Sequence, residues 1–63
     1  SDPRLAEALQ KLETAGDDIE FDPNIPGDTA QMKKVAKAIA QQEFNDLEYE
    51  IWQELYDEQL TQG

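Results

Sequence analysis

The sequence predicts an all-α protein, a small three-helix bundle formed as a single domain over residues 1–63. Apolar residues recur at intervals of three and four, the spacing that places them on one face of a helix. Gly and Pro gather between residues 16 and 27, and a capping residue precedes each periodic stretch. In a chain this short, a core barely offsets the entropy of ordering the residues, which costs on the order of 1.5 kcal/mol per residue.

The first helix is predicted over residues 3–15. Asp2 is a suitable N-cap, because its carboxylate can accept hydrogen bonds from amides of the first turn, and Pro3 suits the first helical position. Gly16 provides a left-handed stop at the other end. One face of this helix carries Leu5, Ala8, Leu9 and Leu12.

The segment over residues 16–27 is predicted to be an ordered loop that is both acidic and apolar. Its two prolines and two glycines prevent a regular helix. It also carries three large apolar side chains, Ile19, Phe21 and Ile25, which are too many for a solvated linker. We therefore expect at least two of them to fold back onto the helices.

The second helix is predicted over residues 28–43. Asp28 and Gln31 have the spacing of a capping box at its start. If this helix continued without a break to residue 60, its apolar face would become acidic halfway along the helix. That face is defined by Met32, Val35, Ala36, Ile39 and Ala40.

A third helix is predicted over residues 45–60. Asn45 and Glu48 again have the spacing of a capping box, and Phe44 and Tyr49 occupy the two positions of a hydrophobic staple. These signals place a break near residue 44, where the apolar face would otherwise turn acidic.

The predicted core draws large apolar residues from all three helices. The alternative is a helical hairpin in which one long second helix of roughly 50 Å, at 1.5 Å per residue, replaces the last two. The short first helix could not cover such a length, so the hairpin would require a dimer or another partner. The core residues expected in the bundle are Leu5, Leu9, Leu12, Val35, Ile39, Phe44, Leu47, Ile51 and Leu55.

The composition disfavours catalysis. The chain has no His and no Cys, so it has no disulfide, no thiol nucleophile, no Cys/His zinc site and no imidazole base. Its hydroxyl groups therefore lack the partner that would activate them. Paired carboxylates would need a cleft with two distinct environments, which a bundle of this size rarely has. We expect no catalytic residue, no cofactor and no enzymatic activity.

The acidic loop was compared with the calcium-binding loop of an EF-hand. A register starting at Asp18 puts Pro23 where Gly is required and Thr29 where the bidentate Glu belongs. A register starting at Asp22 places Lys33 at the bidentate position. Both registers fail, so we expect a solvated acidic loop and no metal site.

The net charge of -10, from 15 acidic and 5 basic residues, argues against direct binding of nucleic acid. The same charge disfavours anionic membrane surfaces. The longest apolar run is three residues, over 38–40, which is too short for a transmembrane segment or a signal peptide. We therefore expect a cytoplasmic protein.

The predicted third helix carries an aromatic stripe displaced by about 100° to 150° from its core-facing stripe. Residues 43–63 also hold seven acidic residues and no basic one. Aromatic anchors bordered by carboxylates fit a protein partner with a basic surface. The residues predicted to bind that partner are Tyr49, Trp52, Tyr56, Glu48, Asp57 and Glu58.

The sequence therefore favours a small acidic helical module, such as an adaptor, inhibitor or regulatory subunit, that binds a basic protein surface through its C-terminal helix. Nucleic-acid mimicry, in which carboxylates occupy a nucleic-acid-binding groove, is one form of this hypothesis. In a structural alternative, the wide apolar arc of the last helix packs against a second copy, forming a homodimer. A further alternative places the aromatic stripe in the core, covered by the first helix and the loop.

Overall fold

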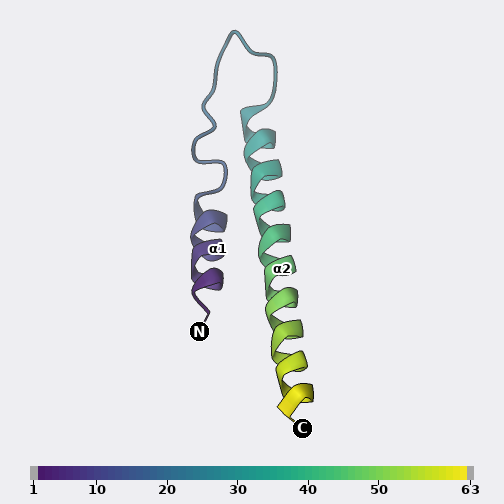
Figure 1. Cartoon of the computed structure of the whole chain (residues 1–63). Helices are drawn as coiled ribbons and strands as arrows, with labels where there is room; N and C mark the ends of the chain where they lie inside the picture. The colour runs from purple at the N-terminus through teal and green to yellow at the C-terminus, as the bar shows by residue number, and fades with distance from the viewer. Residues whose placement is uncertain (1, 63) are drawn as a thin grey trace.

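A computed structural model describes residues 2–62 of the chain, which form two helices and, within that range, no strand. The first helix, α1, spans Pro3–Thr14, and the second, α2, spans Thr29–Gln62. They form a hairpin in which α1 lies beside the middle of α2, while the connecting loop extends past the N-terminal end of α2 (Figure 1). The all-α prediction is confirmed. The three-helix bundle is wrong, and the alternative hairpin with one long second helix fits.

The first helix forms as its sequence predicts. The Oδ1 atom of Asp2 accepts a hydrogen bond of 2.8 Å from the backbone N–H of Arg4, and Pro3 occupies the first turn. At the other end, the N–H of Ala15 donates to the carbonyl of Leu12 at 3.3 Å. α1 therefore ends one residue earlier than predicted.

Gly16 lies close to the backbone of α2. Its φ of +86° is in the left-handed region, where a side chain is disfavoured. A Cβ at this position would lie 3.2 Å from the Cα of Lys33 and 3.3 Å from its carbonyl oxygen. Gly16 is also the one buried residue of the described range. The absence of a side chain thus allows the turn after α1 to contact the α2 backbone directly.

The long helix begins at the predicted cap and continues through the predicted break. The Oδ1 atom of Asp28 accepts hydrogen bonds from the N–H groups of Ala30, at 3.0 Å, and Gln31, at 3.2 Å. Asn45 does not cap a third helix. Its Oδ1 atom instead accepts a hydrogen bond of 3.0 Å from the side-chain amide of Gln41, one turn earlier in the same helix.

A continuous apolar stripe explains why α2 needs no break. Steps of four, four, three and four residues keep the stripe facing α1, with a mean interval close to the 3.6 residues of a helical turn. The apolar face predicted for residues 28–43 was partly wrong. It included Met32, Val35 and Ile39, which are exposed and lie to one side of the face that packs on α1. The half-buried stripe consists of Ala36, Ala40, Phe44, Leu47 and Ile51.

The predicted core forms only in part. No hydrophobic residue among residues 2–62 is fully buried. Leu5, Leu12, Phe44, Leu47 and Ile51 are half-buried between the helices, whereas Leu9, Val35, Ile39 and Leu55 are exposed. In the loop, only Ile19 is half-buried, and both Phe21 and Ile25 are exposed. The expectation that at least two of these three residues fold back was therefore wrong.

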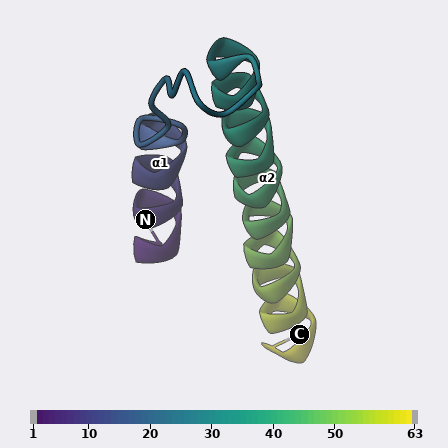
Figure 2. The same ribbon diagram turned by 90° about the horizontal axis from the view of Figure 1, so that it is seen from above.

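The hairpin is elongated, with principal extents of 61 × 16 × 12 Å. Its radius of gyration is 16.9 Å, against about 11 Å for a compact domain of this length. α1 has 12 residues and α2 has 34. α1 therefore covers a limited part of one side of α2, and α2 extends beyond α1 at both ends (Figure 2).

Candidate protein-binding face

The three aromatic residues of the predicted site are exposed on α2. Tyr49 is 66% exposed, Trp52 59% and Tyr56 49%. The rings of Trp52 and Tyr56 stack, with centroids 5.7 Å apart and an interplanar angle of 13°. Neither α1 nor the loop covers these side chains, so the alternative that places them in the core of this chain is wrong.

The stripe lies on the side of α2 that faces away from α1. At 100° per residue, its mean direction is about 150° from that of the half-buried stripe. The loop is at the opposite end of α2 (Figure 1). Among residues 2–62, the aromatic side chains therefore have no neighbouring element that could bury them.

The predicted acidic residues are exposed but do not all border the stripe. In the helical projection, Glu48 flanks one side of the stripe and Asp57 lies on the other. Glu58 instead lies on the α1-facing side of α2, beyond the region that α1 covers. The helix thus brings Glu48 and Asp57 close to the aromatic residues, and Glu58 only to the same end of the molecule.

Sequence reasoning missed two neighbours of the stripe. Leu60, four residues after Tyr56, is exposed and extends the apolar surface toward the C-terminal end. Gln53 is half-buried, and its side-chain amide donates a hydrogen bond of 3.0 Å to the hydroxyl of Tyr49. Leu60 follows Tyr56 by four residues, and Gln53 follows Tyr49 by four. Residues four apart are neighbours on a helix surface, so this spacing could have identified both.

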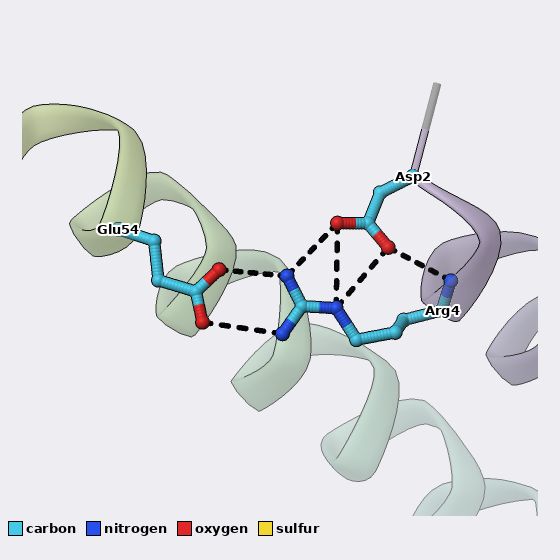
Figure 3. Close-up of polar contacts among 3 residues, drawn as sticks. All are labelled: Asp2, Arg4 and Glu54. Atoms are coloured by element: carbon cyan, nitrogen blue, oxygen red, sulfur yellow. Dashed lines mark hydrogen bonds and ion pairs between the residues drawn. The ribbon is translucent and has the colours of Figure 1, made fainter. Parts of the chain in front are cut away.

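One acidic residue of this half of α2 is neutralised by α1. The guanidinium of Arg4 donates to both carboxylate oxygens of Glu54, at 3.2 and 2.6 Å, and to the carboxylate of Asp2, with one contact of 2.9 Å (Figure 3). Hydrogen bonds donated by Arg4 lower the pKa of both carboxyl groups, and the same bonds, first to Glu54 and then to Asp2, raise the pKa of Arg4. This bridge ties the start of α1 to the C-terminal half of α2.

The other acids of this segment have no basic partner within residues 2–62. α2 also has no basic residue in its last turn, where the helix dipole disfavours negative charge. Both features leave a strong negative potential around the aromatic stripe, which a cationic partner would relieve. The unpaired acids are Glu43, Asp46, Glu48, Glu50, Asp57 and Glu58.

Two open clefts lie between the helices, and one of them, of about 500 Å³, is lined by Leu5, Ile51 and Leu55. A cleft of about 250 Å³ lies beside Ala8, Phe44 and Leu47, with Lys11 and Glu43 among its polar residues. Drug-sized ligands usually occupy at least 300 Å³. The cleft beside Phe44 is therefore smaller than a usual ligand site.

The described residues include no group of three carboxylates that could hold a metal ion. In the acidic loop, the Oδ1 atom of Asp22 accepts a hydrogen bond of 2.9 Å from the N–H of Asn24, which is typical of an Asx turn. Neither helix in this range is both long and apolar enough to cross a membrane.

Comparison with known proteins finds no matching family model, no matching curated protein and no matching solved structure.

Proposed function

We propose that this chain is a small, non-catalytic protein-binding module, such as an adaptor, inhibitor or regulatory subunit. Its binding face is the C-terminal half of α2, and its partner presents a basic protein surface. One observation carries this proposal. Tyr49, Trp52 and Tyr56 are exposed on the side away from α1, in a segment that has seven acidic residues and no basic one.

The two properties of this face have different energetic roles. Burying a large apolar side chain contributes roughly 1.5–3 kcal/mol, so the aromatic residues are the expected source of affinity. The carboxylates attract a cationic partner over a longer range, which raises the association rate and makes that rate sensitive to salt. Together these properties favour a partner that combines an apolar contact with surrounding Lys or Arg residues.

Nucleic-acid mimicry is one form of the same proposal. Glu43, Glu50 and Asp57 recur every seven residues along one side of α2 and are all exposed. A row of carboxylates on a rigid helix could occupy a cationic groove that otherwise receives phosphates. If the chain mimics nucleic acid, it should compete with duplex DNA for binding to the isolated partner.

Replacing Trp52 by Ala tests the proposed face. We expect the Kd for a partner purified from the source cells to rise at least about tenfold, because a central aromatic anchor is lost. The thermal midpoint should change little, since substitutions at exposed positions usually alter stability by less than about 0.5 kcal/mol. Fluorescence anisotropy and thermal circular dichroism would measure the two quantities.

The matched control is Phe21→Ala, which removes an aromatic residue that is 74% exposed on the loop, far from the face. This variant should bind as tightly as the wild type. Unchanged affinity in Trp52→Ala, or a Trp52→Ala variant that unfolds, would show that the binding face lies elsewhere.

A further inference from the structure

Two residues of the aromatic stripe, Tyr49 and Tyr56, belong to a longer, mainly apolar row along α2, and Trp52 lies at the edge of that row. Starting at Met32, residues at alternating steps of three and four lie about 140° around the helix from the half-buried stripe. This row, here called the outer seam, extends for about 42 Å at 1.5 Å per residue. Six of its nine members are exposed apolar or aromatic residues. The outer seam consists of Met32, Val35, Ile39, Gln42, Asp46, Tyr49, Gln53, Tyr56 and Leu60.

The spacing of the outer seam is that of a coiled coil. A strict repeat of seven residues, with contacts at its a and d positions, is the pattern by which two helices pack along their length. Met32, Ile39 and Leu60 occupy a positions, and Val35 and Tyr56 occupy d positions. The surface that fits this pattern along its whole length is another α-helix.

The polar members of the outer seam form hydrogen bonds to other members of the seam. The side-chain amide of Gln42 donates to the Oδ1 atom of Asp46 at 2.9 Å, and that of Gln53 donates to the hydroxyl of Tyr49. They lie in the middle of the seam, between apolar residues at both ends. Polar residues at such positions set the register and choice of partner at some cost in affinity.

The two edges of the outer seam differ in charge. The acidic edge, at the e positions, carries Glu43, Glu50 and Asp57, all exposed. The neutral edge, at the g positions, carries no charge and consists of Gln31, Ala38, Asn45, Trp52 and Gln59. A partner helix must therefore present Lys or Arg along one of its edges and can be uncharged along the other.

A second copy of the chain does not meet this requirement. In an antiparallel pair of helices, each e edge faces the e edge of the other helix, so the acidic edges of two copies would repel. In a parallel pair, Asp46 would face Asp46 of the other copy within the seam. Two chains, each with a net charge of -10, also repel at long range.

The charge at the end of α2 favours one orientation of the partner. The last turns of α2 contain Asp57 and Glu58 and no basic residue, and the helix dipole adds negative potential there. A helix that runs antiparallel to α2 would bring its positive N-terminal end to this region. A parallel helix would bring its negative end instead.

We propose that the outer seam binds an antiparallel, cationic helix that has apolar residues at its a and d positions and Lys or Arg at its e positions. This inference rests on the proposed function, because it names the class of partner for the same acidic face. It also extends the binding surface to Met32, Val35 and Ile39, in the N-terminal half of α2.

Two synthetic four-heptad peptides of identical composition test the inference. Both carry Leu and Ile at a and d, one has Lys at e and Gln at g, and the other has these two edges exchanged. The first peptide should bind the full chain at least about tenfold more tightly, because only its lysines face the acidic edge in an antiparallel pair. Titration calorimetry in 0.15 M salt would measure both affinities.

The variant Ile39→Ser tests the extent of the seam. It should weaken binding of the first peptide about tenfold, whereas Leu9→Ser, at an exposed leucine of α1, should leave binding unchanged. If only Trp52→Ala affects binding, the site is confined to the C-terminal half, which overturns the inference and leaves the proposed function standing.

The remaining outcomes separate the two proposals. Equal binding of both peptides, or tighter binding of the second, would overturn the antiparallel seam while supporting a cationic partner. Failure of both peptides to bind would overturn the inference, whereas the proposed function is tested separately by the effect of Trp52→Ala on binding of the purified partner. A tight dimer of the chain alone, detected by light scattering, would show that a second copy occupies the seam and would overturn the inference.

Discussion

At the scale of single residues, Arg4 connects the two helices. Its guanidinium binds Asp2 and Glu54 together, so one side chain both supports the α1 cap and fixes the start of α1 beside the C-terminal half of α2. The ion pairs are exposed to solvent, where such contacts are screened and weak. Their role is therefore to set the position of α1 rather than to supply most of the stability.

The pH dependence of this bridge can be predicted from the lowered pKa values of Asp2 and Glu54. A lowered pKa means that the folded state binds these protons less readily than the unfolded state. The resulting stabilisation is present above the ordinary pKa values of 3.8 for Asp2 and 4.5 for Glu54, and is lost as the pH falls through the lowered values.

We expect Arg4→Gln to raise the pKa of the Glu54 carboxyl toward its ordinary value, as measured by NMR titration of the side-chain carbon. The variant should also be less stable than the wild type at neutral pH, with the difference disappearing in acid. The control is Lys11→Gln, which also removes one positive charge from α1. Because Lys11 pairs with Glu7 and not with Glu54, this variant should leave the titration of Glu54 unchanged. Identical Glu54 titration in Arg4→Gln and the wild type would contradict the bridge.

At the scale of secondary-structure elements, local signals predicted the ends of the helices better than their continuity. Asp2, Asp28 and Gly16 act where the sequence places them, because caps and stops depend on neighbouring residues. The capping-box spacing at Asn45 was misleading, since the same amide can pair with Gln41 inside a helix. The exposure of the aromatic stripe could not be predicted, because it depends on how much of α2 is covered by α1.

The continuity of α2 makes a specific prediction for Asn45→Ala. Loss of an N-cap would cost about 1 kcal/mol. At an exposed helix interior, Ala is instead favoured over Asn by up to about 0.7 kcal/mol, partly offset by loss of the exposed hydrogen bond with Gln41. We expect unchanged or higher thermal stability by circular dichroism. A clear decrease would support a helix boundary at residue 45.

At the scale of the whole molecule, α2 is a dipolar rod that is only partly covered. Residues 29–42 carry three lysines and no acid, while residues 43–62 carry seven acids and no base. The loop, which also contains acidic residues, lies at the lysine-bearing end of α2 (Figure 1). The negative potential at the far end therefore arises from α2 itself, close to the aromatic residues.

Exchanging Asp57 and Glu58 for Asn and Gln should have two opposite effects. Helix stability should rise by some tenths of a kcal/mol per residue, because unfavourable charges leave the last turns of α2. Association with a cationic partner should slow at low salt, and this loss should shrink as the ionic strength increases. Circular dichroism and stopped-flow fluorescence of Trp52 would measure the two effects separately.

The matched control removes the same net charge from the loop through Asp17→Asn and Asp18→Asn. Because the loop lies at the other end of α2, its charges contribute less than Asp57 and Glu58 to the field at the binding face, and least at 0.15 M salt, where the screening length is about 8 Å. The loop variant should therefore associate at nearly the wild-type rate. Equal slowing by both double variants would mean that net charge, and not the local field at the end of α2, steers the partner.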